Sequence, residues 1–114
     1  MFFENSHSAI RVAGSGSTPL LASDIIAGVN GRALAIECKS GKGKRYITKK
    51  QIDELREFSK RFGAESWVGV RFDREGWYFL SIEDLNMSST GNNYVVDISL
   101  AKKKGLDFNE LIKV

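Results

Sequence analysis

The residues best suited to chemistry are two carboxylates and a lysine on two segments that are predicted to be neighbouring strands. Asp24 opens the first segment (residues 24–29), and Glu37 and Lys39 lie in the second (residues 33–39). Side chains two positions apart on a strand point to the same face of a sheet. We therefore expect Glu37 and Lys39 on one face, with Ala33 and Ala35. The other face should carry Leu34, Ile36 and Cys38.

This spacing predicts a divalent metal site. The dipeptide Asn30-Gly31 between the two segments is a strong hairpin signal, and such a turn folds Asp24 back toward Glu37. Two converging carboxylates repel each other unless a cation lies between them, and Mg²⁺ is a hard ion that takes oxygen ligands. The backbone carbonyl of Cys38 could supply another oxygen. Lys39 would then orient or activate a water and stabilise charge that develops on a phosphate.

A simpler alternative remains for the same residues. Glu37 and Lys39 could form an ion pair in water on an edge strand, where such pairs contribute little stability. Asp24 could simply begin a strand after Ser23. The upstream aspartate, the hairpin spacing and the neighbouring cations together favour the metal site.

The composition restricts the class of protein. A chain of 114 residues with 42% hydrophobic residues predicts one globular domain over residues 1–114. Its single cysteine excludes an intramolecular disulfide and a cysteine-based zinc cage within one chain. The sequence shows no apolar run of membrane-spanning length and no secretory signal, so we expect a cytoplasmic protein without a membrane partner.

Positive charge is concentrated in the middle of the chain. Residues 32–61 contain ten Lys or Arg against four acids, whereas residues 73–114 contain five against seven. A basic centre beside a slightly acidic tail indicates a polyanion-binding face. Charge alone is equally compatible with a solvated surface.

Periodicity and turn residues predict an α/β protein. Thr48 and Gln51 form a capping-box pattern at the start of a helix that ends before Gly63. A weaker capping box, Asp107 with Glu110, opens a short C-terminal helix. One helical turn is expected over residues 81–85, an exposed loop over 88–93, and mobile loops over 13–18 and 40–45. Alternation and β-branched content predict strands over residues 8–13, 24–29, 33–39, 66–72 and 76–80.

Four motifs in this order resemble a known family. The Asp and Glu-x-Lys arrangement resembles the PD-(D/E)xK nuclease core, and the resemblance to the archaeal Holliday junction resolvases is more specific and covers roughly residues 2–85. The motifs are AIRVAGSGS (9–17), DIIAG (24–28), IECKS (36–40) and EFSKRFGA (57–64). The resemblance implies a restriction-endonuclease-like fold, with a mixed central β-sheet flanked by helices. It also implies a homodimer that cleaves four-way DNA junctions in recombination and repair, with Mg²⁺ or Mn²⁺.

The resemblance also implies roles for individual residues. Asp24 and Glu37 match the metal ligands, and Lys39 matches the catalytic lysine. Phe58 and Phe62 match aromatic residues of the dimer-forming helix. The residues expected to contact DNA, from the motifs and from the basic segment, are Arg11, Ser15, Lys42, Lys44, Arg45, Lys49 and Arg71.

Two departures from the family pattern affect these expectations. Ser23 stands where a proline often precedes the aspartate, a position that shapes the turn and does no chemistry. The family also begins with a helix that carries a glutamate of the metal site, ahead of the part matched here, and Glu4 matches a later position. The alternative expectation is therefore a catalytically impaired or non-catalytic module that binds branched DNA.

Overall fold

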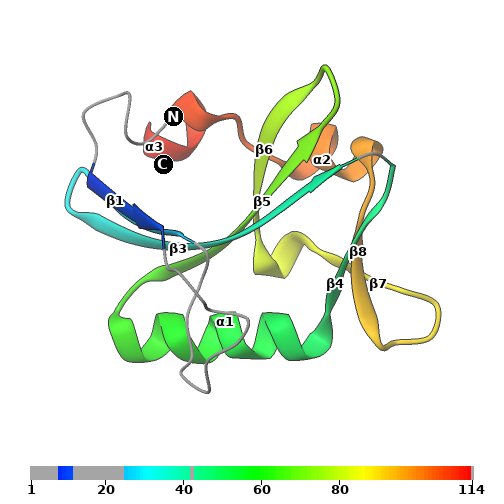
Figure 1. Ribbon diagram of the computed structural model, residues 1–114, viewed down its shortest axis with the longest axis horizontal. Coiled ribbons are helices and arrows are strands. Elements are labelled where there is room, and N and C mark those ends of the chain that lie inside the picture. Colours follow the sequence, from blue (N-terminus) through cyan, green and yellow to red (C-terminus); the bar gives the residue numbers. More distant parts are fainter. Residues whose placement is uncertain (1–7, 12–24, 42, 114) are drawn as a thin grey trace.

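The computed structural model describes residues 8–11, 25–41 and 43–113, and its centre is a five-stranded mixed sheet (Figure 1). The strand order is β1-β2-β3-β5-β6, with β3 and β5 parallel and the other neighbours antiparallel. A smaller antiparallel sheet has the order β4-β8-β7. The strands are β1 (Ser8–Arg11), β2 (Ile25–Val29), β3 (Arg32–Gly41), β4 (Arg45–Thr48), β5 (Glu65–Phe72), β6 (Gly76–Ser81), β7 (Asn86–Met87) and β8 (Asn93–Val96).

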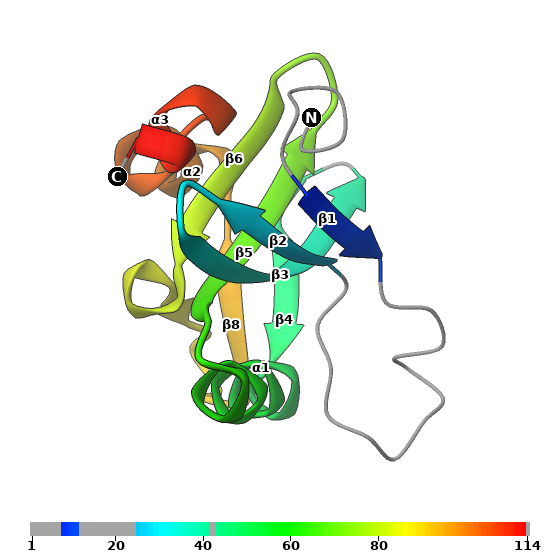
Figure 2. The same cartoon turned by 90° about the vertical axis from the view of Figure 1, so that its left-hand side faces the viewer.

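Helices lie on both sides of the large sheet, as the predicted fold class requires. The long helix α1 (Lys49–Phe62) lies in the connection between the parallel strands β3 and β5. The short helix α3 (Phe108–Lys113) lies on the other side of the sheet from α1 (Figure 2). Two further helical segments are the 3₁₀ turn η1 (Ile82–Asp84) and α2 (Ile98–Lys104).

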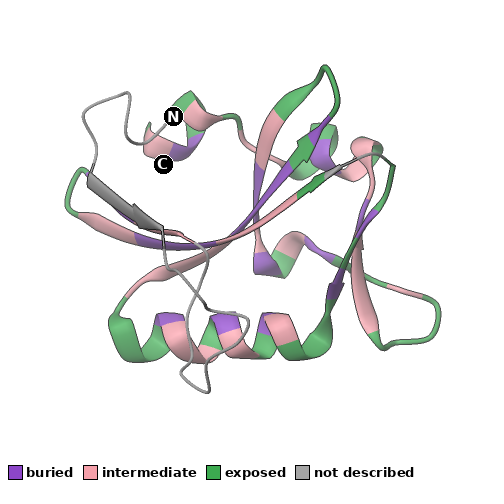
Figure 3. Ribbon diagram, in the orientation of Figure 1, coloured by how far each residue is buried: buried purple, intermediate pink, exposed green. Residues whose placement is uncertain are grey.

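Two apolar clusters cover the two faces of β3, and its alternation explains both. Ala35 packs in the first cluster with Ile52 and Leu55 of α1. Leu34 and Ile36 pack in the second with Leu111 of α3. Successive side chains point to opposite faces of a strand, so the predicted alternation of residues 33–39 is confirmed. Buried residues line the middle of β3, β5 and β6, while the tip of the β5–β6 hairpin is exposed (Figure 3).

The predicted turns and helix caps are present. Asn30 and Gly31 both adopt positive φ, of 51° and 80°, as a tight hairpin turn between β2 and β3 requires. At the start of α1, Thr48 and Gln51 exchange the two capping-box hydrogen bonds, each 3.0 Å long. Gly63 ends the helix in the left-handed conformation, and its N–H donates to the carbonyl of Ser59 over 2.8 Å.

The smaller predicted elements are also confirmed. Asp107 and Glu110 form the capping box before α3, with hydrogen bonds of 2.7 and 2.9 Å. The turn η1 lies within the expected residues 81–85. Residues 88–92 form a loop, and Asn93 already belongs to β8. Of the segments expected to be strands, residues 12–13 and Asp24 lie outside the described part of the chain, as does the predicted loop over 13–18.

The prediction of a loop over residues 40–45 is wrong at both ends. β3 continues through Ser40 and Gly41, and Arg45 is the first residue of β4. Four observed elements have no counterpart among the predicted ones: β4, β7, β8 and α2. Each of these three strands is at most four residues long, too short for a clear alternation pattern. In addition, β4 pairs with β8, which lies far along the chain, so no local signal marks either strand.

Candidate functional site

Glu37 and Lys39 lie side by side on β3 and are partly enclosed. Their side chains are 16% and 26% exposed, and Nζ of Lys39 is 3.8 Å from Oε2 of Glu37. They pair in register with Val68 and Val70 of β5. Within the described residues the pairing of β3 with β2 ends at Ile36, so β5 is the strand that flanks both residues, and their low exposure is not that of a fully solvated pair.

The two side chains are partly shielded from water, which affects how their charges interact with each other. A carboxylate that loses most of its contact with water needs a compensating charge or hydrogen bonds. The 3.8 Å separation is an ion-pair distance, longer than the roughly 2.7–2.9 Å of a charge-assisted hydrogen bond. The lysine therefore compensates the carboxylate electrostatically while its amine remains partly open to solvent.

Cys38 lies between these two residues and has a different environment. Its backbone pairs with Gly69 of β5, and its half-buried side chain packs against the second apolar cluster. The thiol therefore faces away from Glu37, as predicted. Only the backbone carbonyl remains a candidate ligand at this position.

Part of the predicted site falls outside the described residues. Asp24, Ser15 and Lys42 are not described, so the structure does not place them. Arg11 lies in β1, where its backbone pairs with Ile25. Within residues 8–11, 25–41 and 43–113, no group of three or more His, Cys, Asp or Glu residues is placed to hold a metal. Of the predicted metal ligands, the described residues therefore include only Glu37 and the Cys38 carbonyl.

Arg45 does not have the position expected of a phosphate contact. Its side chain is only 5% exposed, and its guanidinium lies over the ring of Phe72, 4.8 Å from the ring centre. The guanidinium donates hydrogen bonds to the carbonyls of Gly43 and Arg71, the latter over 2.9 Å. These contacts stabilise the connection between β3 and β4, and they withdraw Arg45 from the surface.

Arg71 is exposed but lies on the opposite face of the sheet from Glu37. It pairs in register with Ser40 of β3, so its side chain alternates to the same face as Gly69 and Cys38. Arg71, one of the expected DNA contacts, therefore does not share a face of the sheet with the Glu37–Lys39 pair.

Other predicted contact residues lie at the surface. Lys44 and Lys49 are both exposed, before β4 and at the start of α1. Lys44 also lines an open groove of about 550 Å³ with Tyr46 and residues of β7 and β8. These two lysines remain available for a polyanion.

Phe58 and Phe62 form an aromatic pair on one side of α1. Their rings are stacked, with centroids 5.4 Å apart and an interplanar angle of 19°. Phe58 packs against the first cluster, whereas Phe62 is 54% exposed. Exposed aromatic rings of this kind are enriched in contacts between proteins.

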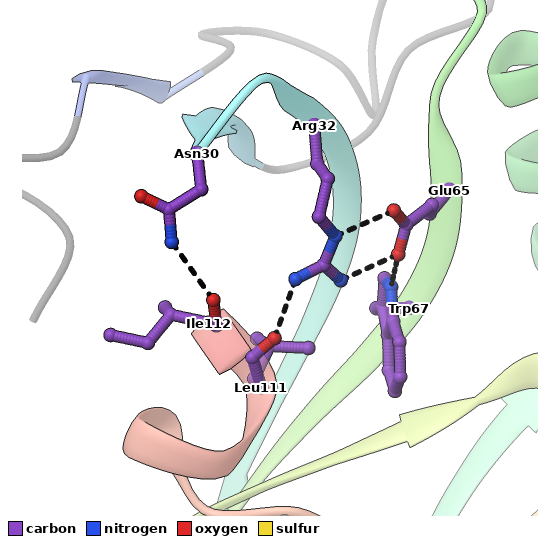
Figure 4. A network of polar contacts seen from close by, with 6 residues as sticks. All are labelled: Asn30, Arg32, Glu65, Trp67, Leu111 and Ile112. Carbon is purple, nitrogen blue, oxygen red and sulfur yellow. Dashed lines mark hydrogen bonds and ion pairs between the residues drawn. The ribbon is translucent and has the colours of Figure 1, made fainter. Parts of the chain in front are cut away.

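A polar network at the opposite end of β3 was not predicted (Figure 4). Arg32 donates two hydrogen bonds to the Glu65 carboxylate, 2.8 and 2.7 Å long, and a third of 2.7 Å to the carbonyl of Leu111. Trp67 donates to the same carboxylate over 3.0 Å, and the Asn30 amide donates to the carbonyl of Ile112 over 3.0 Å. We call these residues the α3 latch, because they attach α3 to the start of β3 and β5.

The latch shifts the acidity of its charged members. The hydrogen bonds from Arg32 hold the pKa of the Glu65 carboxyl below its ordinary value, with a smaller contribution from Trp67. Burial opposes this shift of the Glu65 pKa. The same pairing raises the pKa of Arg32 above its ordinary value. Its partners are far apart in sequence, so no local motif indicates the network.

The fold and the site together define a class of protein. A mixed central sheet, flanked by helices, carries a Glu-x-Lys pair on an inner strand next to an antiparallel hairpin. This is the architecture of restriction-endonuclease-like α/β proteins. In the described part of the chain, no helix is both long enough and apolar enough to cross a membrane.

Comparison with known proteins identifies the family. A family model described as archaeal Holliday junction resolvase (Hjc) matches residues 1–114. The crossover junction endodeoxyribonuclease Hjc of Methanocaldococcus jannaschii is 39% identical over 104 residues, which cover 90% of this chain and 71% of that protein. Its counterpart from Archaeoglobus fulgidus is 40% identical over 94 residues, which cover 81% of this chain and 67% of that protein.

A solved structure agrees with the sequence comparisons. The structure of Archaeoglobus fulgidus Hjc, a Holliday junction resolvase, superposes with a TM-score of 0.89 at 33% identity, covering 98% of this chain and 89% of that chain. The chain belongs to the archaeal Holliday junction resolvase family.

Proposed function

We propose that this chain is a structure-selective endonuclease that cuts four-way DNA junctions by metal-dependent hydrolysis of phosphodiester bonds, as a homodimer. The observation that carries the proposal is the partly enclosed Glu37–Lys39 pair on the inner strand β3. Membership of the resolvase family supplies the substrate class. A DNA substrate of this kind is consistent with a cytoplasmic location.

The register of the β2–β3 hairpin supports a second carboxylate beside Glu37. Ile25 pairs with Ile36, and Ile26 with Ala35. If this antiparallel register continues by one residue, Asp24 lies opposite Glu37. Residues that are directly opposite share a face of the sheet, so both carboxylates would lie on the face that carries Lys39.

The donor set fits a hard divalent cation. The candidate ligands are the carboxylates of Asp24 and Glu37 and the carbonyl of Cys38, all of them oxygens, which Mg²⁺ prefers and Mn²⁺ accepts. A bound ion of this kind would polarise the phosphate and activate water. The chain itself contributes the Lys39 amine, which can orient the attacking water and stabilise negative charge on the phosphate.

Phosphate contacts would come from cations around this site. Lys44 and Lys49 are exposed, and Arg11, Ser15 and Lys42 complete the proposed set, with Arg71 at the end of β5. Arg45 is excluded from the set because its guanidinium is buried against Phe72. Such contacts give affinity and salt dependence but read little sequence.

Selectivity for a junction would come from two sites at a fixed separation. A homodimer presents two equivalent sites, and two opposed strands of the junction can then be cut. We assign the dimer contact to the Phe58–Phe62 pair of α1, because Phe62 exposes a large aromatic ring.

The test is cleavage of a labelled four-way junction by Asp24→Asn and Glu37→Gln. Each change removes a ligand charge while keeping nearly the same shape, so we expect cleavage with Mg²⁺ or Mn²⁺ to fall by at least about 100-fold. Junction affinity should stay within about threefold, since phosphate contacts determine most of it. Glu83→Gln, an exposed glutamate after β6, serves as the matched control and should cut normally.

Other results of the same cleavage assay would contradict the assigned ligands or indicate a different function. Full cutting by either site variant would overturn the assignment of the metal ligands. A wild-type protein that shifts the junction without cutting it would be a non-catalytic DNA-binding module. Cutting of linear duplex as fast as the junction would indicate a different nuclease specificity.

A further inference from the structure

Helix α2 ends in three consecutive lysines that the proposed site does not use. Lys102, Lys103 and Lys104 are all exposed, in the last turn of the helix. Ala101 is fully buried in the first apolar cluster, the same cluster that covers the Ala35 side of β3. Helix α2 therefore packs on the side of the large sheet that carries Glu37 and Lys39.

A row of paired residues leads across the sheet from Lys39 to the end of α2. Lys39 pairs with Val70 of β5, and Val70 pairs with Tyr78 of β6. Gly105, directly after α2, packs so closely on Tyr78 that a side chain at position 105 would lie 3.1 Å from the Tyr78 Cβ. Strands are about 4.8 Å apart and Leu106 pairs with Phe79 at the outer edge of β6, so three spacings and a lysine side chain place these ammonium groups on the order of 10–20 Å from Lys39.

The tip of the β5–β6 hairpin adds to this basic group. Lys102 forms an ion pair of 3.6 Å with Glu75, which ties the end of α2 to the tip. Arg74, at the tip with a φ of 65°, is exposed. Among the described residues, the ion pairs include Lys102 but neither Lys103 nor Lys104. In the described part of the chain, Glu75 thus pairs with Lys102, and none of the ion pairs involves Lys103, Lys104 or Arg74.

A purely structural role accounts for only part of this arrangement. Cations in the last turn of a helix interact favourably with its carbonyl end, whatever else they bind. This effect on the helix does not require α2 to end near the row of paired residues that begins at Lys39. It also does not require Arg74, which lies on a separate hairpin. Both features suit an extended polyanion that continues from the candidate site.

We propose that Lys103, Lys104 and Arg74 bind the phosphates of a duplex arm of the junction, away from the cut. Successive phosphates of one strand are about 3.4 Å apart along the helix axis, so a reach of 10–20 Å corresponds to roughly 3–6 base pairs from the scissile phosphate. This inference rests on the proposed function, because the arm is defined by the cut. It adds a second contact surface, which holds the arm while the site holds the branch point.

The test compares Lys103→Ala/Lys104→Ala with the wild-type protein for binding of a four-way junction without divalent metal. Each lost phosphate contact lowers the slope of log affinity against log salt by about 0.9, so we expect the slope to fall by about 1–2. The dissociation constant should rise about 3–10-fold near 0.1 M salt. Uncharged methylphosphonate linkages 3–6 base pairs from the mapped cut should weaken the wild type and leave the double variant unchanged.

Two single variants guard against a simple loss of folding. Lys113→Ala removes the matching lysine from the last turn of α3, which packs on the second apolar cluster, and should leave the slope unchanged. Glu75→Gln removes the acid that pairs with Lys102 and should strengthen binding by about twofold. An effect of opposite sign cannot come from unfolding.

The outcomes separate this inference from the proposed function. Equal salt slopes for the double variant and the wild type, in a protein that cuts junctions, would overturn the inference alone. If the wild type cuts no junction, the proposed function fails instead. The same slopes measured on linear duplex would then decide whether α2 binds phosphates.

Discussion

Glu37 and Lys39 show what a charged pair contributes on a largely apolar strand. Desolvation of two charges offsets most of their attraction, so a partly enclosed ion pair is a poor source of stability. Their position, at 16% and 26% exposure and 3.8 Å apart, therefore suits chemistry better than it suits packing. The pattern of residues 33–39 predicted this face correctly, because strand alternation is a local property. It could not predict the burial of Arg45, whose partner Phe72 lies on another strand.

The α3 latch leads to a prediction about pH. Glu65→Gln should lower the free energy of unfolding by about 0.5–1 kcal/mol near pH 7, a small value because the Glu65 side chain is 42% exposed. The folded-state pKa of Glu65 is lowered, so its contribution is present above the ordinary glutamate pKa of about 4.3 and is lost as the pH falls through the lowered value. Urea unfolding of both proteins near pH 7 and below about pH 3 measures the difference.

A matched control uses a glutamate in a more exposed ion pair. Glu57 pairs with Arg61 one turn along α1, and Glu57→Gln should change the free energy of unfolding by no more than about 0.5 kcal/mol. A Glu65→Gln effect that persists at acid pH would show that packing, not charge, is the cause.

At the scale of elements, the sequence predicts the helices and strands whose ends carry turn or cap residues. Asn30-Gly31 marks the β2–β3 turn, Thr48 and Gln51 begin α1, and Gly63 ends it. The short strand β4 has no such signal, since it begins with a buried arginine and ends at the cap of α1. Its partner β8 is distant in sequence, so only the tertiary structure identifies both strands. The same is true of α2, whose seven residues are too few for a clear periodicity.

The cap of α1 can be tested directly. Thr48→Ala removes the side chain that accepts from the Gln51 N–H, and we expect a loss of about 1 kcal/mol in the free energy of unfolding. Thr48→Ser keeps the hydroxyl and should retain most of that stability. Chemical denaturation of the three proteins measures both differences. Equal losses for alanine and serine would show that the threonine methyl group, not the cap, matters.

For the whole molecule, the proposed assembly depends on one exposed aromatic residue. Phe62→Ala removes the exposed ring of the α1 pair, so we expect a shift from dimer to monomer in sedimentation or light scattering, by about 10-fold or more in the dissociation constant. Junctions should then be nicked on one strand at a time instead of being cut in pairs. At concentrations where both proteins are monomeric, the melting temperature should change little, because Phe62 is outside the buried clusters.

The control for this prediction is another exposed aromatic residue. Tyr46 is 57% exposed on β4, which leads into the start of α1, whereas Phe62 is at the end of that helix, and Tyr46→Ala should leave the oligomeric state unchanged. If Phe62→Ala remains as dimeric as the wild type, α1 is not the dimer contact.

The position of the α3 latch also indicates where a label can be attached to the protein without blocking the candidate site. Arg32 and Asn30 hold the carbonyls of Leu111 and Ile112 at the start of β3, whereas Lys39 lies toward the other end of that strand. A fluorophore or surface tether attached at position 113 would therefore lie near the opposite end of β3 from the candidate site. Molecules fixed to a bead through that position should still accept a junction from solution, which makes single-molecule observation of cutting practicable.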